Sequence, residues 1–172
     1  MIRLASLYTV MRKLYVLSFG LLLMACQSEG QPRNAEDRFA QLGRQVYQTY
    51  CATCHQPNGQ GVANIYPPLT PNAWIQGDKG RLIRLVLHGV QGEMRVGDQV
   101  YNNVMTAHEF LSDDQIAAVL TFVRQNFGNK ADPVTPEEVA AVRAASQQKG
   151  PWEASVLWDQ VGIPRTNAAP NP

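Results

Sequence analysis

The chain has 172 residues, which is enough for one domain with short extensions at its ends. Apolar residues make up 45% and charged residues 17% of it, a composition typical of a globular protein. The formal net charge of +1, without any run of like charges, excludes an obvious nucleic-acid-binding protein. No nucleic-acid partner is therefore expected.

Residues 1–25 have the composition of an export signal. Two basic residues precede an apolar run, 14–24, which is shorter than the about 20 residues that a membrane-spanning helix needs. The next feature, Leu-Met-Ala-Cys at 23–26, resembles a bacterial lipobox, in which Cys26 is lipidated and becomes the first residue of the mature protein. We therefore predict a periplasmic protein held on a membrane by this lipid, with the outer membrane favoured over the inner one. An ordinary secretory signal with an incidental cysteine is the alternative, and Met11 would start a leader of more usual length.

A polar segment containing Gly and Pro, 26–35, is predicted to be a flexible tether. The following helix is predicted to run from Ala35 to Cys51, because apolar residues recur there three and four positions apart. Residues 56–70 are rich in Gly and Pro and are predicted to form a loop.

Further helices are predicted in the second half of the chain. One lies between residues 80 and 89, and the irregular stretch 89–108 is expected to contain a short hairpin around Gly97. The clearest helix, 112–128, begins with the capping box Ser-Asp-Asp-Gln and ends at a glycine. A last short helix begins at 135–138, Thr-Pro-Glu-Glu, which combines a second capping box with proline at the first helical position.

The sequence Cys-Ala-Thr-Cys-His at 51–55 is the pattern of c-type haem attachment. In this pattern the thiols of Cys51 and Cys54 add to the haem vinyl groups, and one helical turn lets His55 bind the iron from the same side. A redox-active dithiol is expected near a βαβ pattern, which is absent here. A zinc site would need a second ligand pair, which the one remaining cysteine, Cys26, cannot supply. The sequence therefore predicts one covalently bound haem c.

The residues around this motif resemble those of small class I bacterial cytochromes c, and they follow one another in that family's order over about half of the chain. They are Gly43 and Tyr47 before the motif, Gly59-Gln60-Gly61 and Tyr66-Pro67-Pro68-Leu69 after it, then Leu87-His88-Gly89, Val100 to Met105, and Leu111-Ser112-Asp113-Asp114. The resemblance implies an all-α class I cytochrome c fold, with three to five helices around one haem over residues 36–128. A C-terminal extension with one short helix follows at 129–172. The resemblance also implies that Gly43 lets the first helix cross close to the last, near Tyr47 and Phe122.

The resemblance further implies that Met105 is the second axial ligand of the iron. A thioether favours reduced iron and closes the site to small molecules, which suits electron transfer. The family usually has proline directly after this methionine, whereas this chain has Thr106, so we expect a softer ligand loop. Met94, His108 and His88 remain alternative ligands, in that order, although a hydrogen-bonded structural role explains His88 more simply.

An electron carrier, rather than an enzyme, is the function that this ligand set predicts. We expect the protein to take electrons from a periplasmic dehydrogenase or respiratory enzyme and to pass them to another redox protein. The alternatives are a haem enzyme or small-gas sensor with an open or His-ligated iron, and a relay subunit of a larger oxidoreductase complex. The C-terminal extension is expected to cover the domain's own apolar surface, with docking on a partner as the alternative. Arg81, Arg84 and Trp74 stay outside the predicted site, because surface or core roles explain them as well.

Overall fold

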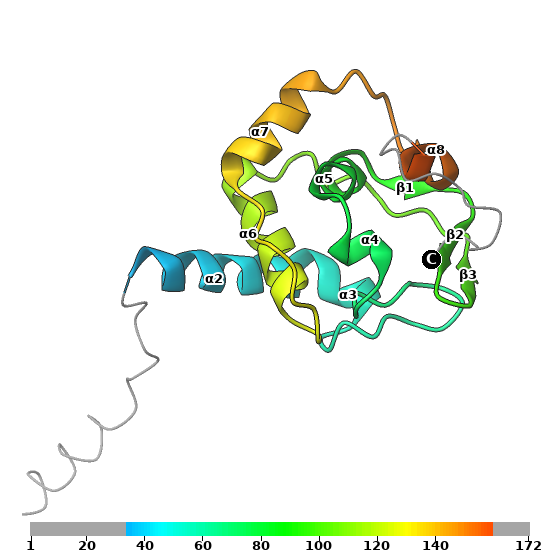
Figure 1. Ribbon diagram of the computed structural model, residues 1–172, viewed down its shortest axis with the longest axis horizontal. Helices are drawn as coiled ribbons and strands as arrows, with labels where there is room; N and C mark the ends of the chain where they lie inside the picture. The colour runs from blue at the N-terminus through cyan, green and yellow to red at the C-terminus, as the bar shows by residue number, and fades with distance from the viewer. Residues whose placement is uncertain (1–33, 160–172) are drawn as a thin grey trace, which may run out of the picture. The chain divides into compact units, whose positions relative to one another are not determined.

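The computed structural model describes residues 34–159, so the predicted signal and the lipidated Cys26 lie outside the described residues (Figure 1). The helices are α2 (Ala35–Val46), the π-helical turn η1 (Tyr47–Cys51), α3 (Ala52–His55), α4 (Ala73–Gln76), α5 (Lys79–His88), α6 (Asp113–Gln125), α7 (Pro136–Ala145) and α8 (Ala154–Asp159). The strands are short: β1 (Val90–Gln91), β2 (Met94–Val96), β3 (Gln99–Tyr101) and β4 (Trp152–Glu153). Within 34–159, no helix combines the length and the apolar character needed to cross a membrane.

Helices α2 and α6 cross at Gly43. A Cβ atom at this position would lie 2.3 Å from the carbonyl oxygen of Ala118, so only glycine lets the two backbones approach this closely. Beside the crossing, the ring centroid of Tyr47 lies 5.3 Å from that of Phe122 and 5.1 Å from that of Phe127. The crossing that the resemblance implies is confirmed.

Helix α6 begins as predicted. The Ser112 hydroxyl accepts a bond from the Gln115 N–H, and the Gln115 side chain accepts one from the Ser112 N–H. The helix ends at Gln125 rather than at Gly128, because the next residue, Asn126, is already extended (φ −121°, ψ −176°). The apolar face of α6 is buried in the main core, whose members include Val46, Tyr47, Leu82, Ile83, Leu87, Ile116, Val119, Leu120, Val123 and Val139.

Strands β2 and β3 form the predicted hairpin. They pair antiparallel with Met94 opposite Tyr101, and the turn contains Gly97 at φ +58°. Beside this hairpin lies a second core, made by Trp74, Leu85, Val90, Met94, Val96, Tyr101, Ala154, Leu157 and Trp158. The last three belong to the C-terminal extension, so two distant parts of the chain build this core together.

The C-terminal extension folds back onto the domain over its described part, as predicted (Figure 1). Helix α7 packs on α5 and α6, β4 pairs parallel with β1, and α8 packs on the second core. The sequence predicts only one short helix here, which is α7. The sequence does not predict strand β4 and helix α8. Their two and six residues are too few to show a periodic pattern.

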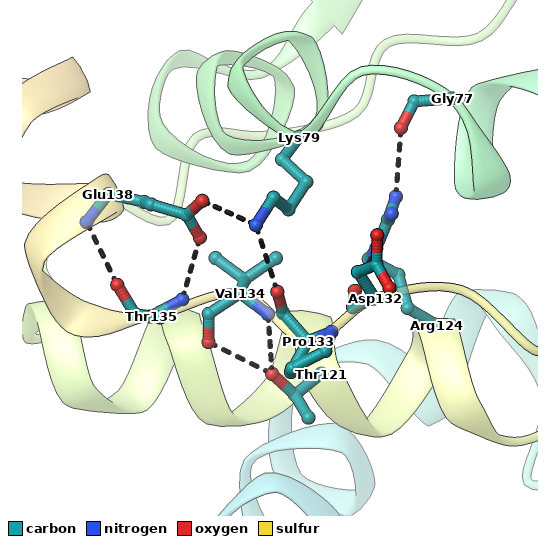
Figure 2. A network of polar contacts seen from close by, with 9 residues as sticks. All are labelled: Gly77, Lys79, Thr121, Arg124, Asp132, Pro133, Val134, Thr135 and Glu138. Carbon is teal, nitrogen blue, oxygen red and sulfur yellow. Dashed lines mark hydrogen bonds and ion pairs between the residues drawn. The ribbon is translucent and has the colours of Figure 1, made fainter.

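Polar contacts fix the segment that leads from α6 into α7 (Figure 2). The Thr121 hydroxyl donates to the Val134 carbonyl at 3.0 Å and accepts from the Val134 N–H at 2.9 Å. The Lys79 ammonium donates to the Pro133 carbonyl at 3.1 Å and forms an ion pair with Glu138. These contacts join α5, α6 and α7, and residues of α5 and α6 in turn line the cavity described next.

Candidate haem-binding site

A cavity of about 320 Å³ contains the residues of the predicted site: Cys51, Cys54 and His55 line it together with Met105. The volume falls within the range of about 300–1,000 Å³ that is usual for ligand sites. The rest of the wall is mostly apolar, and among the residues 34–159 no Lys, Arg, Asp or Glu side chain lines it. A large apolar group fits this lining.

The local fold presents the two thiols and the imidazole to one side of the cavity. The turn η1 carries Cys51, and the single turn α3 carries Cys54 and His55. The chain then reverses at Gln56, which has a φ of +64°. The Tyr47 hydroxyl fixes this reversal by donating to the Gln56 carbonyl at 2.6 Å.

The imidazole of His55 is oriented for metal binding. Its side chain is buried, and its Nδ1 lies 2.9 Å from the carbonyl oxygen of Pro67. Because a carbonyl can only accept, Nδ1 carries the proton and Nε2 is left with a free lone pair. Burial lowers the pKa of His55, with the bond to Pro67 acting in the opposite direction and the neighbouring His108 lowering it further. The ring is therefore held neutral, which is the form that ligates a metal.

The thiols do not resemble those of a redox-active dithiol. Burial, followed by the neighbouring Cys54, raises the pKa of the Cys51 thiol to about 11, whereas reactive dithiols need a lowered pKa. A self-contained metal site is also unsupported in the described part of the chain. Nowhere in 34–159 do three or more His, Cys, Asp or Glu residues come close enough to hold a metal ion.

Three candidates for the second axial position line the cavity and one does not. Met105 is half-buried, Met94 is buried in the second core, and His108 lies beside Tyr50. The Nδ1 atom of His108 is buried and has no hydrogen-bond partner among the described residues. His88 lies away from the cavity lining, and its Nε2 is 2.7 Å from the Ser146 hydroxyl. The structural role expected of His88 is thereby confirmed.

Two residues near the cavity were not anticipated as neighbours of one another. Trp74 lines the cavity, and behind it lies Arg81, whose side chain is fully buried. The guanidinium carbon of Arg81 is 5.0 Å from the Trp74 ring centroid and 4.0 Å from that of Trp158. Neither Arg81 nor Arg84 lines the cavity itself. The sequence gives no indication of this cluster, because Trp158 comes from the C-terminal extension.

The sequence matches the family model for cytochrome c over residues 40–127. The chain belongs to the cytochrome c family. It is 39% identical over 111 residues to cytochrome c-552 of Thermus thermophilus, covering 59% of this chain and 84% of that protein. It is 33% identical over 114 residues to the fructose dehydrogenase cytochrome subunit of Gluconobacter japonicus, and 34% identical over 113 residues to the gluconate 2-dehydrogenase cytochrome c subunit of Pantoea cypripedii. These matches cover 62% and 60% of this chain, but only 23% and 24% of those subunits.

Family and geometry agree on the cofactor. The cytochrome binds one haem c covalently through Cys51 and Cys54, and it is an electron-transfer protein. The predicted class I fold is confirmed by the matched family and by the helical architecture. When bound, the haem supplies an iron that changes oxidation state by one electron. To hold this group the protein would contribute Cys51, Cys54 and the oriented His55 ring, within a wall that has no charged side chain among the described residues.

Proposed function

We propose that this cytochrome is a periplasmic one-electron carrier whose iron is ligated by His55 and Met105 and which is anchored to a membrane through a lipid on Cys26. The observation that carries the proposal is the cavity, which brings Met105 into the same apolar space as the oriented His55. A six-coordinate iron with a thioether ligand exchanges electrons without opening a site for small molecules. Such an iron suits a carrier better than a haem enzyme or gas sensor.

Backbone contacts support Met105 as the ligand. Its N–H donates to the Val90 carbonyl at 2.8 Å, and its carbonyl accepts from the Val90 N–H at 3.1 Å. Gly89 permits this approach, because a Cβ there would lie 2.3 Å from the Met105 carbonyl oxygen. Three residues after Met105, the His108 N–H donates to the Val86 carbonyl at 2.9 Å. The ligand loop is thus fixed at both ends, although Thr106 stands where the family usually has proline.

The ligand assignment is tested with the haem-loaded protein and two matched substitutions. Met105→Ala is expected to remove the weak red absorption band of ferric iron with a thioether ligand. It should also remove the ring-current-shifted methyl resonance of the axial methionine in the reduced protein. Met94→Ala removes the same side chain from the same cavity and should leave both signals in place. The reverse pattern would assign Met94. Absence of both signals from the unmodified protein would reject methionine ligation.

A partner is proposed to dock at the mouth of the cavity. Tyr50 and Val104 line the cavity and are exposed, Val104 to 60%, and Phe110 is 65% exposed with its ring centroid 5.4 Å from that of Tyr50. Exposed apolar clusters of this kind mark interaction sites, and redox encounters need only a small interface. We propose as donor a periplasmic dehydrogenase or respiratory enzyme, in keeping with the dehydrogenase subunits among its relatives. Phe110→Ser should slow reduction by that donor while leaving the midpoint potential unchanged.

Membrane attachment is tested separately at Cys26. In cells making the full chain, Cys26→Ser should move the cytochrome from the washed membrane fraction to the soluble periplasm. Mass spectrometry of the unmodified protein should find acyl chains on the N-terminal peptide that begins at this cysteine. A soluble, unlipidated cytochrome with a free Cys26 would instead support the ordinary secretory signal. Either result leaves the ligand assignment intact.

A further inference from the structure

The C-terminal extension reaches the axial-ligand loop through a single intervening strand. Strand β4 pairs parallel with β1, so that Trp152 lies beside Val90, and the Trp152 N–H donates to the Gly89 carbonyl at 3.0 Å. On its other side, Val90 exchanges two backbone hydrogen bonds with Met105. The order across this small sheet is therefore β4, β1 and then the residue proposed to bind the iron. A shift of β4 therefore displaces β1, and with it the backbone to which Met105 is hydrogen-bonded.

Side chains reinforce the pairing of β4 with β1. The Gln91 side chain donates from Nε2 to Glu153 Oε1 at 2.5 Å. Gly92 follows with a φ of +80°, and a Cβ there would lie 2.5 Å from Glu153 Oε2. Glycine at this position therefore leaves room for the Glu153 carboxylate. These contacts set the register between the two strands.

Helix α8 holds β4 in place through the second core. Leu157 is fully buried and Trp158 is 5% exposed, and both belong to the same core as Trp74 and Met94, which line the haem cavity. The segment 152–159 therefore forms an outer layer behind the cavity wall. Figure 1 shows α8 beside β1, with α7 at a distance along the chain.

A buried guanidinium fastens α8 to that wall. The guanidinium of Arg81 lies against the rings of both Trp158 and Trp74, and its Nη2 donates to the Ala73 carbonyl at 2.6 Å. Its Nε and Nη1 have no hydrogen-bond partner among the described residues. The rings are therefore the main contact of this cation, and the contact ties the extension to α5 and α4.

We propose that residues 152–159 are a strap that positions Met105 on the iron, and that this strap replaces the stiffness a proline at Thr106 would give. The proposal rests on the His55/Met105 ligation proposed above. Dissociation of the thioether requires the loop to move away from β1, and the strap keeps β1 in position. Loosening the strap increases the fraction of molecules in which the sixth position is open. An added ligand such as imidazole binds only to that fraction, so its apparent affinity increases when the strap is loosened.

The test compares substitutions within one helix of the haem-loaded full chain. Trp158→Ala should tighten apparent imidazole binding to the ferric protein by about tenfold or more and weaken the red band of thioether ligation. Val156→Ala changes an exposed residue (44%) of the same helix and should leave both unchanged. Trp158→Phe retains an aromatic ring and should give a smaller change in the same direction, which keeps the test usable if Trp158→Ala folds poorly.

A fourth variant separates the strap from a general loss of stability. Val139→Ala opens a fully buried position of α7 in the main core, away from β4 and α8. It should lower the unfolding midpoint but leave imidazole binding unchanged. Equal imidazole affinity in the Trp158 variants and in Val156→Ala, with the red band present throughout, would overturn the strap alone. If the unmodified protein lacks the red band, the ligation by Met105 is overturned, and the strap with it.

Discussion

Asn129 donates a hydrogen bond of 2.6 Å to the carbonyl of Leu69, which connects the loop after α6 to the proline turn beside the haem cavity. The same amide nitrogen donates to the carbonyls of Val123 at 2.9 Å and Asn126 at 3.0 Å. The side chain is 3% exposed, so water cannot replace these bonds. Because Pro67 of that turn accepts the bond from His55, Asn129 indirectly supports the orientation of the His55 ring.

Asn129→Ala is therefore expected to lower the free energy of unfolding by about 2 kcal/mol, because it leaves buried carbonyls without a donor. Asn126→Ala is the matched control. Its exposed side chain makes one bond, to the Phe122 carbonyl at 2.8 Å, and its removal should cost only about 0.5 kcal/mol. Guanidinium unfolding of the haem-loaded proteins measures both. Equal losses of unfolding free energy would show that the buried bond between Asn129 and Leu69 stabilises the fold no more than the exposed bond of Asn126.

Gly89 gives a second prediction, for the ligand loop. Its φ of +78° disfavours any side chain, and a Cβ would also meet the Met105 carbonyl oxygen at 2.3 Å and the Ala107 nitrogen at 3.0 Å. Gly89→Ala should displace the loop, reduce the red band and lower the midpoint potential, since a thioether favours reduced iron. Gly97→Ala has a similar backbone cost at φ +58°, with no atom within 4 Å of the added carbon.

Gly97→Ala should therefore lose about 1 kcal/mol of stability and keep the potential unchanged. Spectroelectrochemical titration of the two variants measures both the midpoint potential and the red band. An unchanged potential and red band in Gly89→Ala would mean that the loop adapts to the side chain, and that the close contact with Met105 is not required for ligation.

Local sequence patterns were sufficient for much of this fold. The capping boxes at Ser112 and Thr135 involve residues three positions apart, so both helix starts can be predicted from the sequence alone, and both are confirmed. The attachment motif at 51–55 is similarly local. Gly43 required the family resemblance, because the atom it must avoid belongs to Ala118, far along the chain.

Other features could not be predicted, for physical reasons. The pairing of β4 with β1 involves two residues from each strand, which is too few to give an alternating pattern. Arg81 lies near the start of a helix, where a charged residue is usually exposed, and its burial depends on contacts with Trp74 and with the distant Trp158. Met94 and Met105 both line the cavity, so the choice between them still depends on the resemblance and on the loop contacts.

Gly43 itself provides a test of the helix crossing. Gly43→Ala should overpack the contact between α2 and α6, because its Cβ would lie 2.3 Å from the Ala118 carbonyl oxygen, and should cost about 2–3 kcal/mol. Gly80→Ala is the control within helix α5. There the nearest atom is the flexible end of Arg84 at 3.1 Å, and the better helix propensity of alanine should leave stability unchanged or raised by up to about 1 kcal/mol. Similar losses in the two variants would argue against a tight crossing.

The ion pair between Lys79 and Glu138 gives a prediction about pH (Figure 2). The Lys79 ammonium, followed by the Thr135 N–H, lowers the pKa of the Glu138 carboxyl below its ordinary value of 4.5. A carboxyl whose pKa is lower in the folded state stabilises the fold above its unfolded pKa, and this contribution is lost as the pH falls through the folded pKa. The pair therefore favours the attachment of α7 to α5 at neutral pH and not in acid.

Glu138→Gln keeps the acceptor for the Thr135 N–H but removes the charge. Both side chains of the pair are about a third exposed, so water screens the interaction and the expected loss at pH 7 is only about 0.5 kcal/mol. The difference between the variant and the unmodified protein should shrink as the pH is lowered below 4.5, because the native carboxyl becomes neutral as well. Lys79→Met should lose at least as much at pH 7, because it also removes the bond to the Pro133 carbonyl, and the double variant should lose no more than Lys79→Met alone. A loss that is constant across this pH range would assign the effect of Glu138 to packing rather than to its charge.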